Sequence, residues 1–240
     1  MNLKILSLVI IGVCILLPDV CYAFLSKDVH LLNMQNGLAD NTVSAVYKDK
    51  EGFIWFGTRN GLSRYDGRRI TNFERSRSYP SISNLKEVFD GVLAFVDNGV
   101  FSAFDLKKER FLSVVSSSGQ GIPSRGMLQR NDSLVWVISG SELHLMKRCA
   151  SKEGELRLRV QEKYTGWNNQ DNLLVAITYS SDKKSICLID EKGRIILLDA
   201  TNLNSFRVID LGRTGSLSVN SVLYDDGRIW ISTIAHGVIY

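Results

Sequence analysis

The chain has 240 residues, of which 45% are hydrophobic and 22% charged, and this is the composition of a globular protein, not of a disordered one. Its formal net charge of +4 is spread along the sequence without a basic stripe, which argues against nucleic-acid binding. Its 19 glycines and only 3 prolines favour a fold with many tight hairpins.

Residues 1–23 have the pattern of a signal peptide. Lys4 supplies a positive start, and the apolar run from Ile5 to Leu17 is shorter than the roughly 20 residues that span a bilayer as a helix. Small residues stand at both positions that a signal peptidase reads in Cys21-Tyr22-Ala23, so we expect cleavage after Ala23. The alternative is an uncleaved anchor, and with either reading the rest of the chain leaves the cytoplasm.

Residues 41–73 predict four short antiparallel strands. Val43 to Tyr47 and Phe53 to Thr58 are rich in β-branched and aromatic residues, and polar turn formers separate them. Turns at Arg59-Asn60-Gly61 and Asp66-Gly67 leave room for a third strand and a fourth. Four antiparallel strands in about forty residues make one blade of a β-propeller.

The residues around this unit resemble a known repeat. The matching pattern is Gly37-Leu38, Asn41-x-Val43, then Asp49-x-x-Gly52-x-Ile54-Trp55-Phe56-Gly57-Thr58-x-x-Gly61-Leu62-x-x-Tyr65-Asp66-Gly67. It resembles the two-component regulator propeller repeat, which builds the periplasmic sensor region of hybrid two-component histidine kinases. The later units match more loosely. The resemblance implies a periplasmic propeller that senses carbohydrates on behalf of a longer kinase.

Four further units follow the first. We place them near residues 83–112, 125–162, 172–208 and 218–240. Aligned on Trp55, their equivalent positions are Leu93, Trp136, Cys187 and Trp230, at spacings of 38, 43, 51 and 43 residues. Propeller blades repeat at roughly 40 to 50 residues, and no long stretch carries the apolar period of a helix. We therefore expect residues 24–240 to form an all-β propeller of about five four-stranded blades.

Two residue types in the repeat have predicted packing roles. The tryptophans Trp55, Trp136 and Trp230 are expected to fill the space between neighbouring blades, because each blade buries its apolar faces only against its neighbours. Gly57 is expected where two backbones approach closely.

The fifth unit stops after its third strand, which leaves two alternatives. Val29 to Asn33 is predicted to be a short strand, and residues 28–34 could complete the last blade and close a five-bladed ring. Alternatively the chain is part of a longer array. We favour the partial array, because the family that it resembles commonly has two seven-bladed propellers, a further β domain, a membrane span and kinase domains.

Ligand-binding residues are expected in the loops at one end of the propeller. The turns between second and third strands share that end with the connections between blades. The candidates are Arg59, Asn60, Asp97, Asn98, Trp167, Asn168 and His236. In Trp167-Asn168-Asn169-Gln170-Asp171, the aromatic ring could cover the apolar face of a sugar while the amides bind its hydroxyls. The alternative is turn chemistry beside a packed tryptophan.

Catalysis is the less favoured interpretation. Asp97, Glu142 and Glu191 occupy similar turns, and a glycosidase needs two carboxyl groups about 5 to 10 Å apart, but acids are common in such turns anyway. We predict no catalytic residue, cofactor or metal site. Cys149 and Cys187 are expected to be free thiols, although an exported protein permits a disulfide.

The sequence hypothesis is therefore a carbohydrate sensor. We expect an oligosaccharide ligand, no enzymatic activity in this chain, and a longer parent that is a dimeric histidine kinase held in the membrane by its C-terminal part. The alternatives are a secreted propeller glycosidase and a scaffold that holds another protein.

Overall fold

The computed structural model describes residues 30–74, 82–167, 172–212 and 216–240. The chain divides into two compact units, Met1–Asn33 and Met34–Tyr240, and the second carries all of the described strands. Apart from strands, the regular structure in the described ranges is a single short 3-10 helix, η1 (Met34–Asn36). Within those ranges, no helix has the length and apolar character needed to cross a membrane.

The first sheet contains four antiparallel strands in chain order. Its strands are β1 (Val43–Lys48), β2 (Ile54–Thr58), β3 (Gly61–Tyr65) and β4 (Ile70–Phe73). Asp49 shapes the turn between the first two, since its side chain accepts hydrogen bonds from the backbone N–H groups of Glu51 and Phe53. This is the blade expected from the opening repeat.

The next two blades form one eight-stranded sheet. The second blade has β5 (Ile82–Phe89), β6 (Val92–Asp97), β7 (Val100–Asp105) and β8 (Arg110–Ser116). The third has β9 (Gly126–Asn131), β10 (Leu134–Ser139), β11 (Glu142–Cys149) and β12 (Glu155–Tyr164). Their outer strands β8 and β12 pair in parallel, and Glu153 bridges to Lys108 and Arg110 beside this pairing. The sequence pattern did not predict this junction.

The fourth blade is a four-stranded sheet, whereas the fifth has three strands in the described residues. The fourth has β13 (Leu174–Tyr179), β14 (Ser185–Asp190), β15 (Arg194–Asp199) and β16 (Phe206–Asp210). The fifth has β17 (Val219–Asp225), β18 (Arg228–Thr233) and β19 (Gly237–Ile239). The fourth strands of the second, third and fourth blades end a few residues beyond the limits expected from the sequence.

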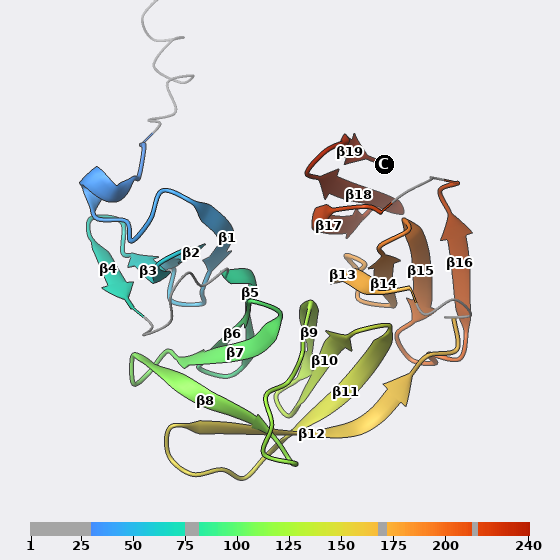
Figure 1. The fold of residues 1–240 in the computed structure, drawn as a ribbon, viewed down its shortest axis with the longest axis horizontal. Helices are drawn as coiled ribbons and strands as arrows, with labels where there is room; N and C mark the ends of the chain where they lie inside the picture. Colours follow the sequence, from blue (N-terminus) through green and yellow to red (C-terminus); the bar gives the residue numbers. More distant parts are fainter. Residues whose placement is uncertain (1–29, 75–81, 168–171, 213–215) are drawn as a thin grey trace, which may run out of the picture. The chain divides into compact units, whose positions relative to one another are not determined.

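Within Met34–Tyr240 the five blades are arranged as in a propeller. The first strand of each blade contacts the first strand of the next, from β1 through β5, β9 and β13 to β17, while later strands lie farther outward (Figure 1). Separate apolar clusters fill the spaces between consecutive blades. The predicted all-β propeller is therefore confirmed.

The packing roles predicted for the first blade are also confirmed. Trp55 is 1% exposed, and its ring packs against those of Phe73 and Phe104, the latter from the second blade. A Cβ added to Gly57 would lie 2.5 Å from the Cγ2 methyl of Ile82, so this glycine permits the close approach of the first two blades. Trp136 is likewise buried and donates to the Tyr179 hydroxyl in the fourth blade.

Two expectations are corrected. Trp230 is 36% exposed and stacks on Tyr240, so in the described structure it does not fill an interblade core. The strand predicted at Val29 to Asn33 is also wrong for its described part, His30–Asn33, which is irregular and is followed by the 3-10 helix. The Asn41 side chain accepts from the Met34 N–H, and this contact favours a compact turn at the start of Met34–Tyr240 over an extended chain.

Candidate ligand-binding channel

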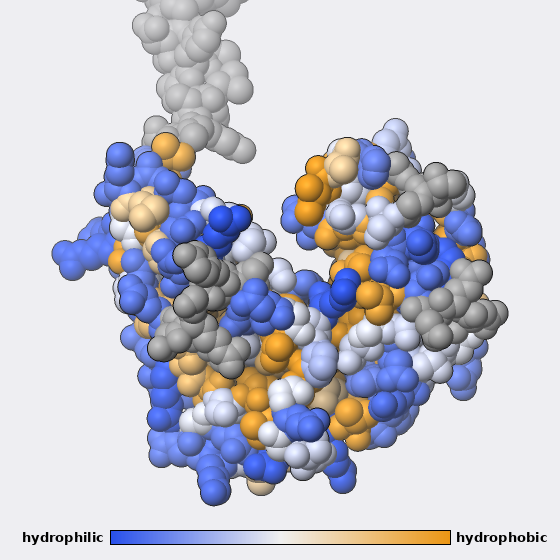
Figure 2. Space-filling model, in the orientation of Figure 1, coloured by the Kyte–Doolittle hydropathy of each residue, from blue (hydrophilic) through white to orange (hydrophobic). Residues whose placement is uncertain are grey.

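The innermost strands line a cavity of about 790 Å³, within the range of small-molecule sites. It is lined by residues of β1, β5, β13 and β17 and by the segment that leads into β9. The space-filling view shows the molecule hollowed between the first and last blades (Figure 2). The neutral polar side chains along the wall include Ser44, Ser83, Asn84, Ser124, Asn220 and Ser221. We call this cavity the channel.

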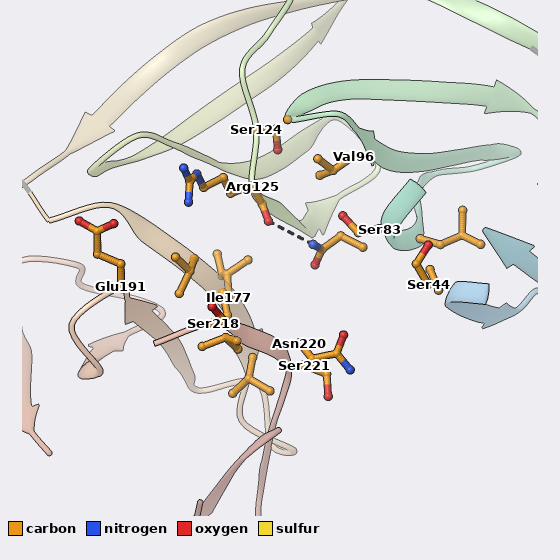
Figure 3. A pocket seen from close by; sticks show the side chains of 18 of the residues that line it. Ser44, Ser83, Val96, Ser124, Arg125, Ile177, Glu191, Ser218, Asn220 and Ser221 are labelled. Carbon is orange, nitrogen blue, oxygen red and sulfur yellow. Dashed lines mark hydrogen bonds between the residues drawn. The ribbon is translucent and has the colours of Figure 1, made fainter. Parts of the chain in front are cut away.

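Polar side chains of the channel tie neighbouring blades together. The Ser44 hydroxyl contacts the carbonyl oxygens of Gly57 and Ile82, and thereby joins the first blade to the second. The Asn84 side chain donates to the Arg125 carbonyl at 3.1 Å and joins the second blade to the third, as the dashed line in Figure 3 shows. These bonds fix the spacing of the innermost strands, so the wall is preorganised. In the same view Ser218 and Asn220 lie on the opposite side of the channel from Ser83.

One end of the channel is built from the loops that the sequence placed together. The Ser124 N–H donates to the Gly99 carbonyl at 2.8 Å, which joins the connection before the third blade to a turn of the second. In the fifth blade, the Ile234 N–H donates to the Ser218 carbonyl at 3.0 Å, which joins the turn between β18 and β19 to the connection that precedes the same blade. The sequence predicted that the connections between blades lie at the same end as the turns between second and third strands. This prediction is confirmed for these loops.

A second cavity of about 590 Å³ shares Val46, Leu85 and Lys86 with the channel. Tyr47 and Tyr179 are among the residues that line it. Burial raises the pKa of the Tyr179 hydroxyl above its ordinary value. The channel thus has serine and asparagine residues in its lining, and the neighbouring cavity has two tyrosines.

Of the seven residues predicted from the sequence, the six that the structure describes are not among those that line the channel. Arg59, Asn60, Asn98 and His236 lie exposed in turns, and the Asn60 amide is engaged with the Ala39 carbonyl. Asn98 comes directly before Gly99, which does line the channel.

Two of the predicted residues are buried. Asp97 is 1% exposed, and its Oδ1 accepts a hydrogen bond from Asn98. Trp167 is 4% exposed and packs in the apolar cluster between the third and fourth blades, edge-on to Phe206. Its ring therefore offers no open face to a sugar, and the structure favours the alternative of a packed tryptophan. Asn168 lies outside the described residues.

The carboxylates considered for catalysis do not form a pair in the channel. Glu191 is the one carboxylate among the described residues of its lining. Glu142 lies in β11, where the Nε2 of His144 is 2.6 Å from its Oε2 and Lys163 is 3.3 Å away. The hydrogen bond from His144 lowers the pKa of Glu142, whereas a general acid needs a raised value.

The described residues contain no cluster of three metal-ligating side chains. Cys149 and Cys187 are both free thiols.

Sequence reasoning missed the channel because it searched the loops and not the first strands. A signal was present in β17, where Asn220 and Ser221 stand between Val219 and the run from Val222 to Tyr224. A polar side chain in an innermost strand has two destinations, the channel or the space between blades. The structure places this pair at the channel.

Comparison with known proteins agrees with this fold. Residues 37–60 match the family model of the two component regulator propeller, and no curated protein matches the chain. The chain resembles the extracellular domain of a candidate hybrid two component system from B. thetaiotaomicron at 20% identity, with a TM-score of 0.58 over 87% of this chain and 30% of that one. It resembles the extracellular domain of a candidate one component system from the same organism at 15% identity, with a TM-score of 0.63 over 88% and 33%.

A propeller of another class gives a similar match. The WD40 β-propeller domain of Doa1 is 13% identical, with a TM-score of 0.57 over 82% of this chain and 62% of that one. Likenesses at these identities establish the fold. The chain spans about a third of each of the two extracellular domains. It is thus a β-propeller that contains a two component regulator propeller repeat and resembles extracellular domains of such systems.

Proposed function

We propose that Met34–Tyr240 is the ligand-binding part of a periplasmic sensor and that the channel binds an oligosaccharide. The observation that carries this proposal is the polar wall of the channel, in which Ser83, Asn84, Asn220 and Ser221 offer donors and acceptors to sugar hydroxyls. The neighbouring cavity has Tyr47 and Tyr179 in its lining, and tyrosine rings can cover the apolar side of a pyranose ring. The resemblance to extracellular domains of signalling systems supports a sensor over other uses of a propeller.

We further propose that the chain belongs to a longer, membrane-anchored protein whose kinase part carries the output. The apolar surface of the fifth blade supports this, because Leu223 and Trp230 are exposed where the equivalent Tyr47 and Trp55 pack in an interblade core. A following blade would bury them. Ligand binding would then bias the arrangement of propellers or of a dimer, and a membrane helix would transmit the bias.

Isothermal titration calorimetry against a panel of oligosaccharides tests the binding proposal. The replacement Asn220→Leu puts an apolar side chain in the channel wall and is expected to weaken binding at least tenfold. Arg59→Ala changes an exposed turn outside the lining and is the matched control. If Arg59→Ala weakens binding and Asn220→Leu does not, the ligand lies in the loops. If the folded chain binds no glycan, the sensor proposal fails.

The DNA downstream of the Tyr240 codon tests the proposed parent. A reading frame that continues into further repeats, a membrane segment and a kinase supports it. A stop codon directly after Tyr240 would contradict it. A catalytic alternative is not favoured, because hydrolysis of a glycosidic bond uses two carboxyl groups and the described channel lining has only that of Glu191.

A further inference from the structure

One residue breaks the repeat inside the channel. Each first strand has a residue that pairs with the position directly after the tryptophan position of the second strand. From the first blade to the fifth, these residues are Val46, Lys86, Met127, Ile177 and Val222. Four are apolar, and only Lys86 is charged. A propeller blade therefore does not need a charge at this position for its packing.

Lys86 is half-buried and lines both cavities where they meet. Among the described residues it forms no hydrogen bond or ion pair. Burial lowers the pKa of its ammonium group, because desolvation acts without a carboxylate to oppose it. A partly buried ammonium group without an ionic partner has lost hydration, which raises its free energy. An anion bound beside it would compensate for this loss.

The other charges around the two cavities are mostly positive. Arg125 lines the channel, and Arg130 and Lys183 line the second cavity. The opposing acids are Glu87 and Glu191. Oε1 of Glu87 already accepts from Lys50 at 3.0 Å and from the Gly91 N–H at 3.2 Å, and Oε1 of Glu191 faces the Leu173 N–H at 3.5 Å. The lining therefore favours a negatively charged guest.

We propose that the channel recognises an acidic oligosaccharide and that Lys86 binds its carboxylate or sulfate group. This inference rests on the proposed sensor function and deepens it, because it names the chemical class of the ligand. Lys86 is one of three residues that line both the channel and the second cavity. An acidic sugar bound in either cavity could therefore bring its charged substituent to Lys86.

Calorimetry with paired probes tests this inference. A galacturonic acid tetrasaccharide carries carboxylates, its methyl ester has the same rings without the charge, and a chondroitin sulfate tetrasaccharide carries sulfates. We expect the wild-type chain to bind one of the acidic probes at least tenfold more tightly than the neutral ester. Lys86→Val should abolish this difference, and Lys86→Arg should preserve most of it.

Other blades of the same chain show that valine is tolerated at the position of Lys86, and an exposed lysine provides a matched control. Valine occupies the equivalent position in the first and fifth blades, so Lys86→Val is expected to fold, which circular dichroism checks. Lys152→Val removes an equal charge from an exposed site outside both cavities and should leave the preference unchanged.

The outcomes separate this inference from the proposed function. Equal binding of acidic and neutral probes, or a preference that survives in Lys86→Val, overturns the role of Lys86 while glycan sensing stands. Binding of inorganic sulfate that Lys86→Val abolishes, with no glycan bound, supports the anion site and overturns the oligosaccharide ligand. If the folded chain binds neither glycans nor sulfate, both proposals fail.

Discussion

Replacing Trp55 by alanine should destabilise the protein far more than replacing Trp230, although the two residues occupy the same position in their blades. Trp55 is 1% exposed, and its Nε1 donates to the buried Asp49 carboxylate at 2.7 Å. A buried tryptophan covers on the order of 200 Å², which corresponds to about 5 kcal/mol at ~25 cal/mol per Å². The lost hydrogen bond to a charged acceptor adds about 1.5 to 3 kcal/mol. We expect Trp55→Ala to lower the free energy of unfolding by at least 4 kcal/mol.

Trp230→Ala is the matched control. Its ring is 36% exposed and stacks on Tyr240, itself 82% exposed, so the expected loss is below about 2 kcal/mol. Urea unfolding followed by tryptophan fluorescence and circular dichroism measures both variants. We reason that burial between two blades, and not the position within a blade, determines how much free energy of unfolding the substitution removes. Equal losses in the two variants would refute this reasoning.

Three further predictions follow from single contacts. Gly57→Ala should cost about 1 to 3 kcal/mol in urea unfolding, because the new Cβ would lie 2.5 Å from a methyl group of the next blade, whereas Gly121→Ala, whose nearest atom is 3.7 Å away, should be close to neutral. The lowered pKa of Glu142 means that its stabilising contribution is present above the unfolded value near 4.5 and is lost as the pH falls through the folded value. Glu142→Gln should therefore flatten the pH dependence of the urea midpoint in this acidic range, and an unchanged profile would contradict the assignment. Burial raises the pKa of the Cys187 thiol to about 12, so mass spectrometry after iodoacetamide treatment at pH 8 should find Cys149 modified in the native protein and Cys187 only in urea.

The local structure of this protein could be read from short stretches of sequence. In the turn between β6 and β7, Asn98 and Gly99 adopt φ values of 50° and 78°, a conformation that these two residue types accept most readily. Short runs of apolar or alternating residues predict the strands on either side, and the recurrence of such units aligned on Trp55 predicts a propeller. These signals are local, because a turn or a strand depends on residues within a few positions.

The candidate site could not be read in this way. Asn84, Arg125 and Asn220 belong to three different blades and meet around one channel only because the innermost strands are neighbours. The exposed turn residues were easier to notice, since turns are rich in polar side chains for conformational reasons as well as functional ones. The strand register aligns Lys86 with apolar residues in the other four blades, and the sequence alone does not specify this alignment.

The sequence by itself determined where the strands and turns lie and that they repeat, because backbone preference and side-chain alternation act over a few residues. Only the tertiary structure decided which faces are covered, that β8 and β12 join two blades, and which side chains share the channel. Those outcomes depend on contacts between residues some forty positions apart, and the chain order of the residues does not specify such contacts until the blades pack against one another.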